Sequence, residues 1–325
     1  MRCFFIVVVL VNLLPGAAFS QCCSPGNPVG GATNIGVLDK KTLRLITFYR
    51  YSYSDTYYSK DAKTNFSSFV KNGNFNYAGL VLGYGLLNKL TVETELGYFI
   101  NRSQTYDIVP AFTNKGFGFN NAVLSLKYNL ISKKEKPFEW TIGAGGKIPF
   151  TKEFQVVNNS ELPRDVQPST HAFGIVAQSF LYKGFPEKGL RLFFVNRYEY
   201  NFTDTRNYQY GNVLFSSFFI AKKLGESNFT ALLQTRHEWR DYDYRDVGIA
   251  SGKGTKINSS GGNIIFVSPQ INYTIAQKWN LSLLADLPVY RYYNGTQLGN
   301  KFAFALYLSR DFGGKCEVKE EKNLE

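Results

Sequence analysis

Charged side chains recur at every second position in several segments of this 325-residue chain. Arg236, Glu238 and Arg240, for example, alternate with His237 and Trp239. Successive side chains of a β-strand point to opposite faces, so such charges gather on one face. There they can neutralise one another across neighbouring strands, or they can form a charged constriction that filters solutes. Alternation assigns the following charged residues to this face, as candidates for lining a lumen: Arg44, Arg50, Glu93, Glu95, Lys127, Glu139, Lys147, Arg191, Arg197, Glu199, Arg236, Glu238 and Arg240.

Residues suited to catalysis or metal binding do not form a complete local pattern. The second residue after His171 is Phe173, and the second after His237 is Trp239, so neither histidine begins the His-x-Ser pair of an outer-membrane phospholipase. The acidic run 241–246 lacks the glycine-punctuated loop of an EF-hand, and we interpret it as a solvated rim. A protease assembled from distant loops would leave no local pattern. The sequence therefore predicts no enzyme, no metal and no cofactor.

The elements that must position these charges are β-strands. About twelve segments of roughly ten residues are apolar or aromatic at every second position, and short connections alternate with long ones, which is the pattern of a transmembrane β-barrel. A soluble β-sandwich would not segregate its loop lengths in this way. We therefore expect an all-β fold, a transmembrane antiparallel up-and-down β-barrel in the outer membrane of a Gram-negative cell. The predicted strands are 42–53, 77–87, 90–100, 121–131, 138–150, 173–182, 190–201, 212–222, 228–242, 264–275, 281–292 and 301–312.

Five glycines fall on the inward face of the predicted strands. They are Gly79, Gly83, Gly85, Gly143 and Gly145. Their missing side chains would make room for a plug or for cargo, or they would relieve strand curvature. The sequence leaves these uses open.

The chain divides into four parts. Residues 1–20 are typical of a secretory signal peptide, with Arg2, an apolar run over 4–14, and small residues before a cut after Ser20. A Cys-, Gly- and Pro-rich segment, 21–41, follows and is expected to be a plug or a periplasmic tether. The barrel would occupy 42–312, and 313–325 would be a charged tail.

Three cysteines would remain after the signal peptide is removed. Cys22 and Cys23 lie at the mature N-terminus and Cys316 lies near the other end. An even strand number places both termini in the oxidising periplasm, where Cys316 could form a disulfide with either of the other two. Lipidation of Cys22 and binding of a soft metal by the vicinal pair are the alternatives.

The amino-acid composition of the chain indicates which kinds of molecule it could bind. The formal net charge is +12, aromatic residues make up 16% of the chain, and the mean hydropathy is −0.21. A value this low suits a barrel as well as a soluble protein, because half of each barrel strand faces water. For an exported barrel, a basic balance favours outer-membrane lipid, anionic lipopolysaccharide and acidic solutes over nucleic acid, and we infer no nucleic-acid binding.

Three stretches resemble one known family. They are GYGLLNKLTVETELG over 83–97, GAGGKIP over 143–149 and PQINYTIAQKWNLSLLADLP over 269–288. Taken in order they resemble the outer-membrane transporter family named for the meta-pathway of phenol degradation. The segment that carries Cys22 and Cys23 departs from that pattern. The resemblance implies passage of small hydrophobic or aromatic compounds across the outer membrane.

Two functional hypotheses follow. The first is an outer-membrane channel, a porin or transporter that passes small, hydrophobic or aromatic solutes by diffusion. The second is a closed structural or interaction barrel that binds a periplasmic partner or a surface partner through its Cys-bearing segment and its outer loops.

Overall fold

The computed structural model describes residues 36–65, 70–107, 109–133, 137–248, 254–276 and 278–313. The expected signal peptide, Cys22, Cys23 and Cys316 lie outside these residues, and so do most of the 21–41 segment and nearly all of the tail. None of the helices in the described ranges is long and apolar enough to cross a bilayer.

Eleven long strands carry the fold in the described part of the chain. Their sequences are rich in Val, Ile, Tyr, Phe and Thr, which favour the pleated conformation. The long strands are β1 (Leu43–Lys60), β3 (Val70–Leu87), β4 (Leu90–Tyr106), β6 (Ala122–Lys133), β7 (Phe138–Ile148), β10 (Gly174–Phe185), β11 (Leu190–Asn201), β12 (Val213–Lys223), β13 (Phe229–Arg240), β16 (Gly262–Ile275) and β17 (Trp279–Phe312). Shorter elements are β2 (Ala62–Lys63), β5 (Phe112–Phe119), β8 (Val156–Val157), β9 (Ser160–Glu161), β14 (Tyr244–Arg245), β15 (Thr255–Lys256) and the 3₁₀ turns η2 (Arg164–Val166) and η3 (Pro186–Lys188).

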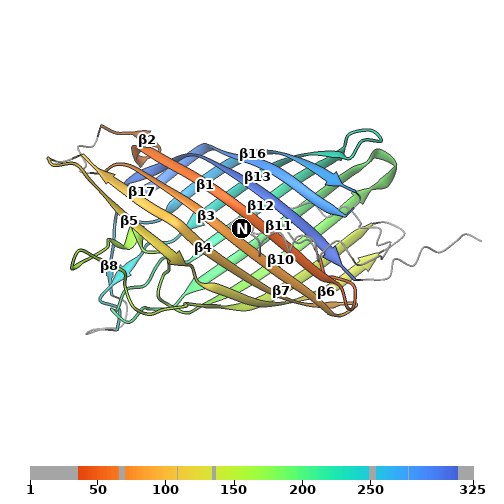
Figure 1. Ribbon diagram of the computed structural model, residues 1–325, viewed down its shortest axis with the longest axis horizontal. Helices are drawn as coiled ribbons and strands as arrows, with labels where there is room; N and C mark the ends of the chain where they lie inside the picture. The colour runs from red at the N-terminus through yellow and green to blue at the C-terminus, as the bar shows by residue number, and fades with distance from the viewer. Residues whose placement is uncertain are drawn as a thin grey trace, which may run out of the picture.

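The long strands form a closed antiparallel ring (Figure 1). Each pairs with the next along the chain, and β17 closes the ring. The first part of β17 pairs with β16, from Trp279 to Tyr293, and its second part pairs with β1, from Thr296 to Phe312. Because β17 turns at Gly295, whose φ is +66°, it crosses the wall twice. The predicted all-β antiparallel barrel is confirmed.

One side of the barrel is taller than the sequence predicts. The predicted strands end at 53 and 100 and the following ones begin at 77 and 121, but β1 continues to Lys60, β3 begins at Val70 and β4 continues to Tyr106. Within 101–120, β5 also pairs with the outer part of β4. These extensions carry polar residues on both faces, which strands tolerate where they rise above the hydrocarbon layer into water. Alternation of polarity, the signal used for prediction, is absent there.

The wall is apolar outside and polar inside. In β6, Leu126 and Tyr128 are exposed, whereas Ser125, Lys127 and Asn129 are buried. This arrangement inverts that of a soluble protein, in which polar side chains face solvent. An outward apolar band is what a bilayer requires of a membrane-spanning barrel.

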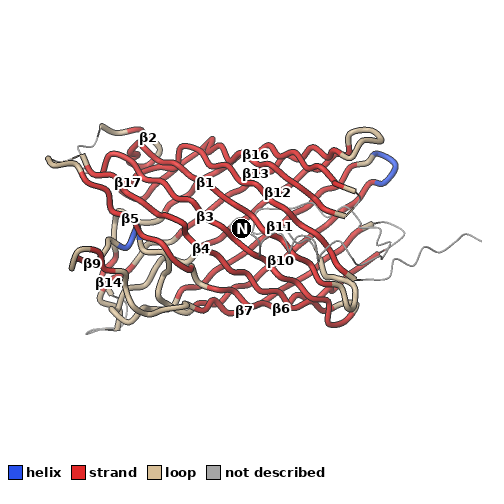
Figure 2. Tube along the Cα trace, in the orientation of Figure 1, coloured by secondary structure: helices blue, strands red, loops and turns tan. Residues whose placement is uncertain are grey.

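The two ends of the barrel differ. Only Asn88 and Lys89 separate β3 from β4, whereas 149–173, which contains β8, β9 and η2, separates β7 from β10. Figure 2 shows η2 among loops at one end and η3 at the other. The described ends of the chain, before β1 and after β17, lie at the end with short turns. With short turns facing the periplasm, as in bacterial outer-membrane barrels, the long connections face outward.

Candidate functional site in the lumen

The first group of inward charges is centred on Arg197 of β11. We call Glu93, Glu95, Lys127, Lys147, Arg197 and Glu199 the Arg197 cluster. Lys127 Nζ lies 2.7 Å from Glu93 Oε1, and Lys147 Nζ lies 3.2 Å from Glu199 Oε2. The cluster holds three cationic and three anionic side chains, so its formal charges sum to zero.

Arg197 links opposite parts of the wall. Its Nη1 lies 2.6 Å from Glu95 Oε1 on β4, and its Nε lies 2.8 Å from Glu199 Oε1 on its own strand. In the ring β4 is separated from β11 by β6, β7 and β10, so the Arg197–Glu95 pair crosses the lumen. This contact also identifies the buried face of the strands as the inner face of the barrel.

The second group is centred on Asp286 of β17. Asp286 Oδ2 lies 2.6 Å from Arg50 Nη2 and 3.2 Å from Arg236 Nη2, and Ser268 donates a hydrogen bond to the same carboxylate. Arg236 Nε also lies 2.8 Å from Glu238 Oε1. We call the four charged residues Arg50, Arg236, Glu238 and Asp286 the Asp286 cluster; it too is neutral. Asp286 was not among the candidates chosen from the sequence. It could have been, because a single acidic residue among the apolar residues of a predicted strand indicates an inward-facing charge.

The remaining candidates lie apart from these clusters. Arg44 is buried near the periplasmic end, with Nη2 2.5 Å from Asp311 Oδ2 on β17. Glu139 is half-buried on β7, Arg191 lines a cavity beside η3, and Arg240 is exposed at the outer end of β13. The structure thus brings nine of the thirteen candidates into two clusters. A role for them in filtering solutes stays a prediction.

Two glycines, Gly79 and Gly97, make room for aromatic rings. A Cβ atom on Gly79 would lie 2.0 Å from the ring of Phe48, and one on Gly97 would lie 1.5 Å from the Tyr77 hydroxyl oxygen. The ring centres of Phe48 and Tyr77 are 5.7 Å apart, and Tyr307 stacks on Phe48 at 5.5 Å. The lumen therefore carries an aromatic surface next to the Asp286 cluster.

A second apolar surface lies on the opposite side of the ring. It is formed by Phe180, Phe193, Val195, Phe219, Ala221 and Leu232 on β10 to β13. Lys127 of the Arg197 cluster lies over it, with Nζ 4.6 Å from the centre of the Phe180 ring. Each charged cluster thus lies against an aromatic surface in the lumen.

Residues 36–41 lie across the periplasmic mouth. The Leu38 amide donates a 2.7 Å hydrogen bond to Thr91 Oγ1, and Leu38 is buried. The Asp39 carbonyl oxygen lies where Gly85 lacks a side chain, only 2.0 Å from the position a Cβ would take. Gly36 reaches the Glu139 carboxylate on β7, far around the ring from β1. The segment therefore narrows this mouth.

Three connections fold over the outer mouth; we call residues 149–173, 202–212 and 241–246 the outer cap. Arg164 joins the first connection to the second, because its Nη1 lies 2.5 Å from Asp204 Oδ2 and its guanidinium carbon lies 3.9 Å from the Tyr208 ring centre. The Tyr208 hydroxyl donates a 2.6 Å hydrogen bond to Asp243 Oδ2. Burial and this contact with Asp243 raise the pKa of Tyr208. Asp243 of the acidic run is thus part of an ordered hydrogen-bond network in the rim.

The described residues contain no group of three or more His, Cys, Asp or Glu side chains that could hold a metal ion.

We expect the outer cap to loosen in acid. The His171 ring packs against the Phe154 ring, with ring centres 4.3 Å apart and planes tilted by 37°, and its Nδ1 lies 3.2 Å from the Thr151 carbonyl oxygen. Burial lowers the pKa of His171 below its ordinary value of 6.5. A lowered histidine pKa means that the unfolded chain binds the proton more readily, so the stabilisation is complete above about pH 6.5 and is lost as the pH falls below it. Faster amide exchange in 149–173 at about pH 5 than at about pH 7.5, after correction for intrinsic rates, would be the result.

His171→Asn is the control for this pH dependence. Asn tolerates the positive φ of +56° at this position and does not titrate in this range. Equal pH dependence in the two proteins would contradict the assignment to His171.

Comparison with known proteins identifies the family. The model of the family described as "Putative MetA-pathway of phenol degradation" matches residues 52–312. The chain belongs to this family. The predicted resemblance is confirmed, and the protein is a β-barrel of the outer membrane. No curated protein matches the chain.

Solved structures include similar barrels. An outer membrane channel from Pseudomonas putida F1 matches with a TM-score of 0.67 at 14% sequence identity, covering 86% of this chain and 98% of that one. The toluene transporter TbuX of Ralstonia pickettii matches with a TM-score of 0.40 at 9% identity, covering 87% and 92%. CymD, described as a monoaromatic hydrocarbon channel, has a TM-score of 0.36 at 9% identity, covering 85% and 90%. The first match supports the barrel architecture, and the other two scores are too low to add to it.

Proposed function

We propose that this member of the family is an outer-membrane channel that passes small, hydrophobic or aromatic solutes by diffusion. Family membership and the likeness to an outer membrane channel support this proposal. TbuX and CymD are described as a toluene transporter and a monoaromatic hydrocarbon channel, which is consistent with aromatic cargo. We assign no catalytic step to the barrel.

The observation that carries the proposal is the neutral, side-chain-built constriction. The Arg197–Glu95 pair crosses the lumen, and the Arg197 and Asp286 clusters each balance their charges internally. A neutral constriction does not reject uncharged solutes electrostatically, and the aromatic surfaces beside it offer planar contacts to an aromatic ring. Passage then requires side-chain rearrangement at the constriction rather than domain motion.

Nicotinamide is a suitable probe, because it is small, aromatic, uncharged and water-soluble. Full-length protein in liposomes is expected to admit nicotinamide faster than protein-free liposomes do, measured by stopped-flow light scattering. Sucrose, a bulkier non-aromatic solute, serves as the size control and should be excluded. Equal rates of nicotinamide entry with and without protein would contradict the proposal.

The second candidate is a closed barrel with a structural or interaction role. One observation favours it: the ion pairs and aromatic clusters occupy the lumen from several sides, and Arg236, Tyr307 and Lys127 are almost fully buried. The liposome experiment separates the two candidates, because a closed barrel admits neither solute. Crosslinking of Cys22 or Cys23 to a periplasmic partner would favour the second.

We also propose that the 21–41 segment is a plug rather than a tether. The support comes from its described end, where Leu38 bonds to Thr91 and Gly36 lies beside Glu139 across the mouth. Deletion of residues 21–38 is expected to raise the single-channel conductance in a planar bilayer. The control is deletion of residues 314–325, which follow β17. An unchanged conductance after deletion of 21–38 would make the segment a tether.

Surrounding lipid is the other partner that we propose. Exposed apolar side chains such as Leu126 and Ile220 form the outward face, and aromatic residues such as Tyr200 and Phe202 are suited to the interface. Contact with lipopolysaccharide at the outer rim is part of the same proposal.

A further inference from the structure

Lysines surround the periplasmic end of the barrel. One lies directly before β1, and each of the five strand connections at this end contributes at least one more; in ring order they are Lys41, Lys89, Lys133, Lys188, Lys223 and Lys278. We call these six residues the periplasmic lysine ring. We propose that this ring binds the phosphate head groups of anionic phospholipid in the inner leaflet of the outer membrane. The inference rests on the proposed contact with lipid and deepens it, because it names the class of lipid and the end of the barrel.

Neighbouring acids do not neutralise these lysines. Three further lysines and three exposed acids of the described chain lie at the same end, and they are Lys40, Lys183, Lys222, Asp39, Glu187 and Glu226. Among the described residues, none of the nine lysines forms an ion pair. The outer end differs, because five ion pairs, such as Lys301 with Asp55, join its cations to acids. Uncompensated positive charge is therefore concentrated at the periplasmic end.

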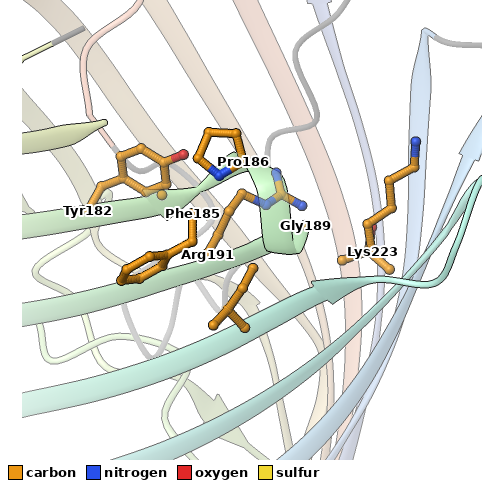
Figure 3. Close-up of a pocket in the computed structure, with 9 residues that line it drawn as sticks. Tyr182, Phe185, Pro186, Gly189, Arg191 and Lys223 are labelled. Atoms are coloured by element: carbon orange, nitrogen blue, oxygen red, sulfur yellow. The ribbon is translucent and has the colours of Figure 1, made fainter. Parts of the chain in front are cut away.

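The turn between β10 and β11 shows how one member of the ring is placed. In Figure 3 the Lys223 side chain extends away from Pro186, Gly189 and Arg191, and Lys223 is exposed. A lysine lays its methylene stem along apolar surface and keeps its ammonium in water or among head groups. The Lys223 ammonium therefore faces the surroundings of the barrel.

The ring lies close to the level of the lipid head groups. Lys133 is two residues beyond the position on β6 that pairs with the exposed Trp140 of β7. Lys223 pairs with the residue after Phe229, whose ring centre lies 4.7 Å from that of Tyr273. Outward aromatic side chains mark the boundary between the hydrocarbon layer and the head groups. Two residues of a strand span roughly 7 Å, so the ammonium groups can reach lipid phosphates.

The distribution of the lysines favours lipid over a single docked protein. The six positions follow the whole circumference, from the segment before β1 to the turn between β16 and β17. A docked protein would cover one arc of the rim, whereas a shell of lipid contacts every strand. Basic residues beside a membrane surface are attracted to anionic lipid, and a zwitterionic head group has no net charge to offer. The ring therefore selects anionic over zwitterionic phospholipid.

Quenching of tryptophan fluorescence by brominated lipid tests the ring. Trp140 and Trp279 lie at the periplasmic end and Trp239 lies at the other, so full-length Trp239→Phe protein reports on the periplasmic end alone. In mixed vesicles, brominated phosphatidylglycerol is expected to bind about threefold or more tightly than brominated phosphatidylcholine. Salt at about 1 M should abolish this preference, because it shortens the screening length to about 3 Å.

A charge-removing variant and a matched control assign the preference to the ring. Lys89→Gln/Lys133→Gln/Lys278→Gln, in the Trp239→Phe background, is expected to lose about twofold or more of the preference for phosphatidylglycerol. The control is Lys63→Gln/Lys115→Gln/Lys256→Gln, which removes three exposed cations at the outer end and should keep the preference.

Equal affinity for the two lipids, or an unchanged preference in the ring variant, would overturn the inference and leave these lysines to a soluble anionic partner. Nicotinamide entry without a preference for phosphatidylglycerol contradicts this inference alone. A preference for phosphatidylglycerol without nicotinamide entry contradicts the channel and leaves the lipid site.

Discussion

Replacing Arg197 by methionine is expected to destabilise the barrel by about 3–5 kcal/mol, because the largely buried Glu95 loses its partner and Glu199 loses one of its two partners. Arg197 is 4% exposed and contacts Glu95 at 2.6 Å and Glu199 at 2.8 Å. Glu199 retains Lys147, whereas within the described part of the chain Arg197 is the one cation that forms an ion pair with Glu95. The measurement is reversible urea unfolding of the protein in lipid vesicles, followed by tryptophan fluorescence.

The same variant is expected to conduct more current. Methionine is uncharged, so it removes the cross-lumen link and leaves a net negative charge in the constriction. A larger single-channel conductance and a shift towards cation selectivity follow. The control is Arg245→Met, because Arg245 is about two-thirds exposed and its contact with Asp246 is 3.8 Å. A stability loss no larger than that of the control would contradict the buried pairing.

Asp286→Asn has the second-largest expected effect. Asp286 is fully buried and is shared by Arg50 and Arg236, so its neutralisation leaves two guanidiniums with a single remaining carboxylate, Glu238. A loss of about 3–5 kcal/mol of unfolding free energy is expected. Asparagine keeps the size and can still accept from Ser268, so the loss reports on charge rather than on packing.

A double variant tests whether Arg50 and Asp286 are energetically coupled within the Asp286 cluster. Arg50→Met combined with Asp286→Asn leaves Arg236 with Glu238 and should recover part of the loss. The exposed residue Asp246 supplies the matched control, Asp246→Asn. Additive losses from Arg50→Met and Asp286→Asn would argue against a shared network.

The barrel could be predicted because its signal is local. Alternation in 122–130 separates outward leucines from inward Ser125 and Lys127 without knowledge of neighbours, and a two-residue turn at Asn88 and Lys89 joins antiparallel strands. The extensions of β1, β3 and β4 could not be predicted by the same rule. Above the hydrocarbon layer both faces of a strand can be polar, so the alternation disappears while the hydrogen-bonded ladder continues.

The arrangement of the lumen depends on closure of the ring. Alternation places Arg197 and Glu95 on the inward face, but only the curvature of the closed sheet brings β11 to within an ion-pair distance of β4. The packing of Phe48 against Gly79 could not be predicted either, because it depends on the register of β1 against β3. Asp286 is different, because its place among apolar residues made it detectable from the sequence.

The conformation of the outer cap has no periodic signal. Residues 149–173 contain only two-residue strands and one 3₁₀ turn, and their order comes from specific contacts such as Arg164 with Asp204. Contacts between three separate connections cannot be read from composition or spacing.

The most direct test of a solute pathway through the lumen is single-channel recording of the full-length protein and of Arg197→Met, side by side in a planar bilayer. A steady unitary current is expected for the natural protein and a larger one for the variant. No current from either protein, with both inserted and folded, would contradict a pathway through the lumen.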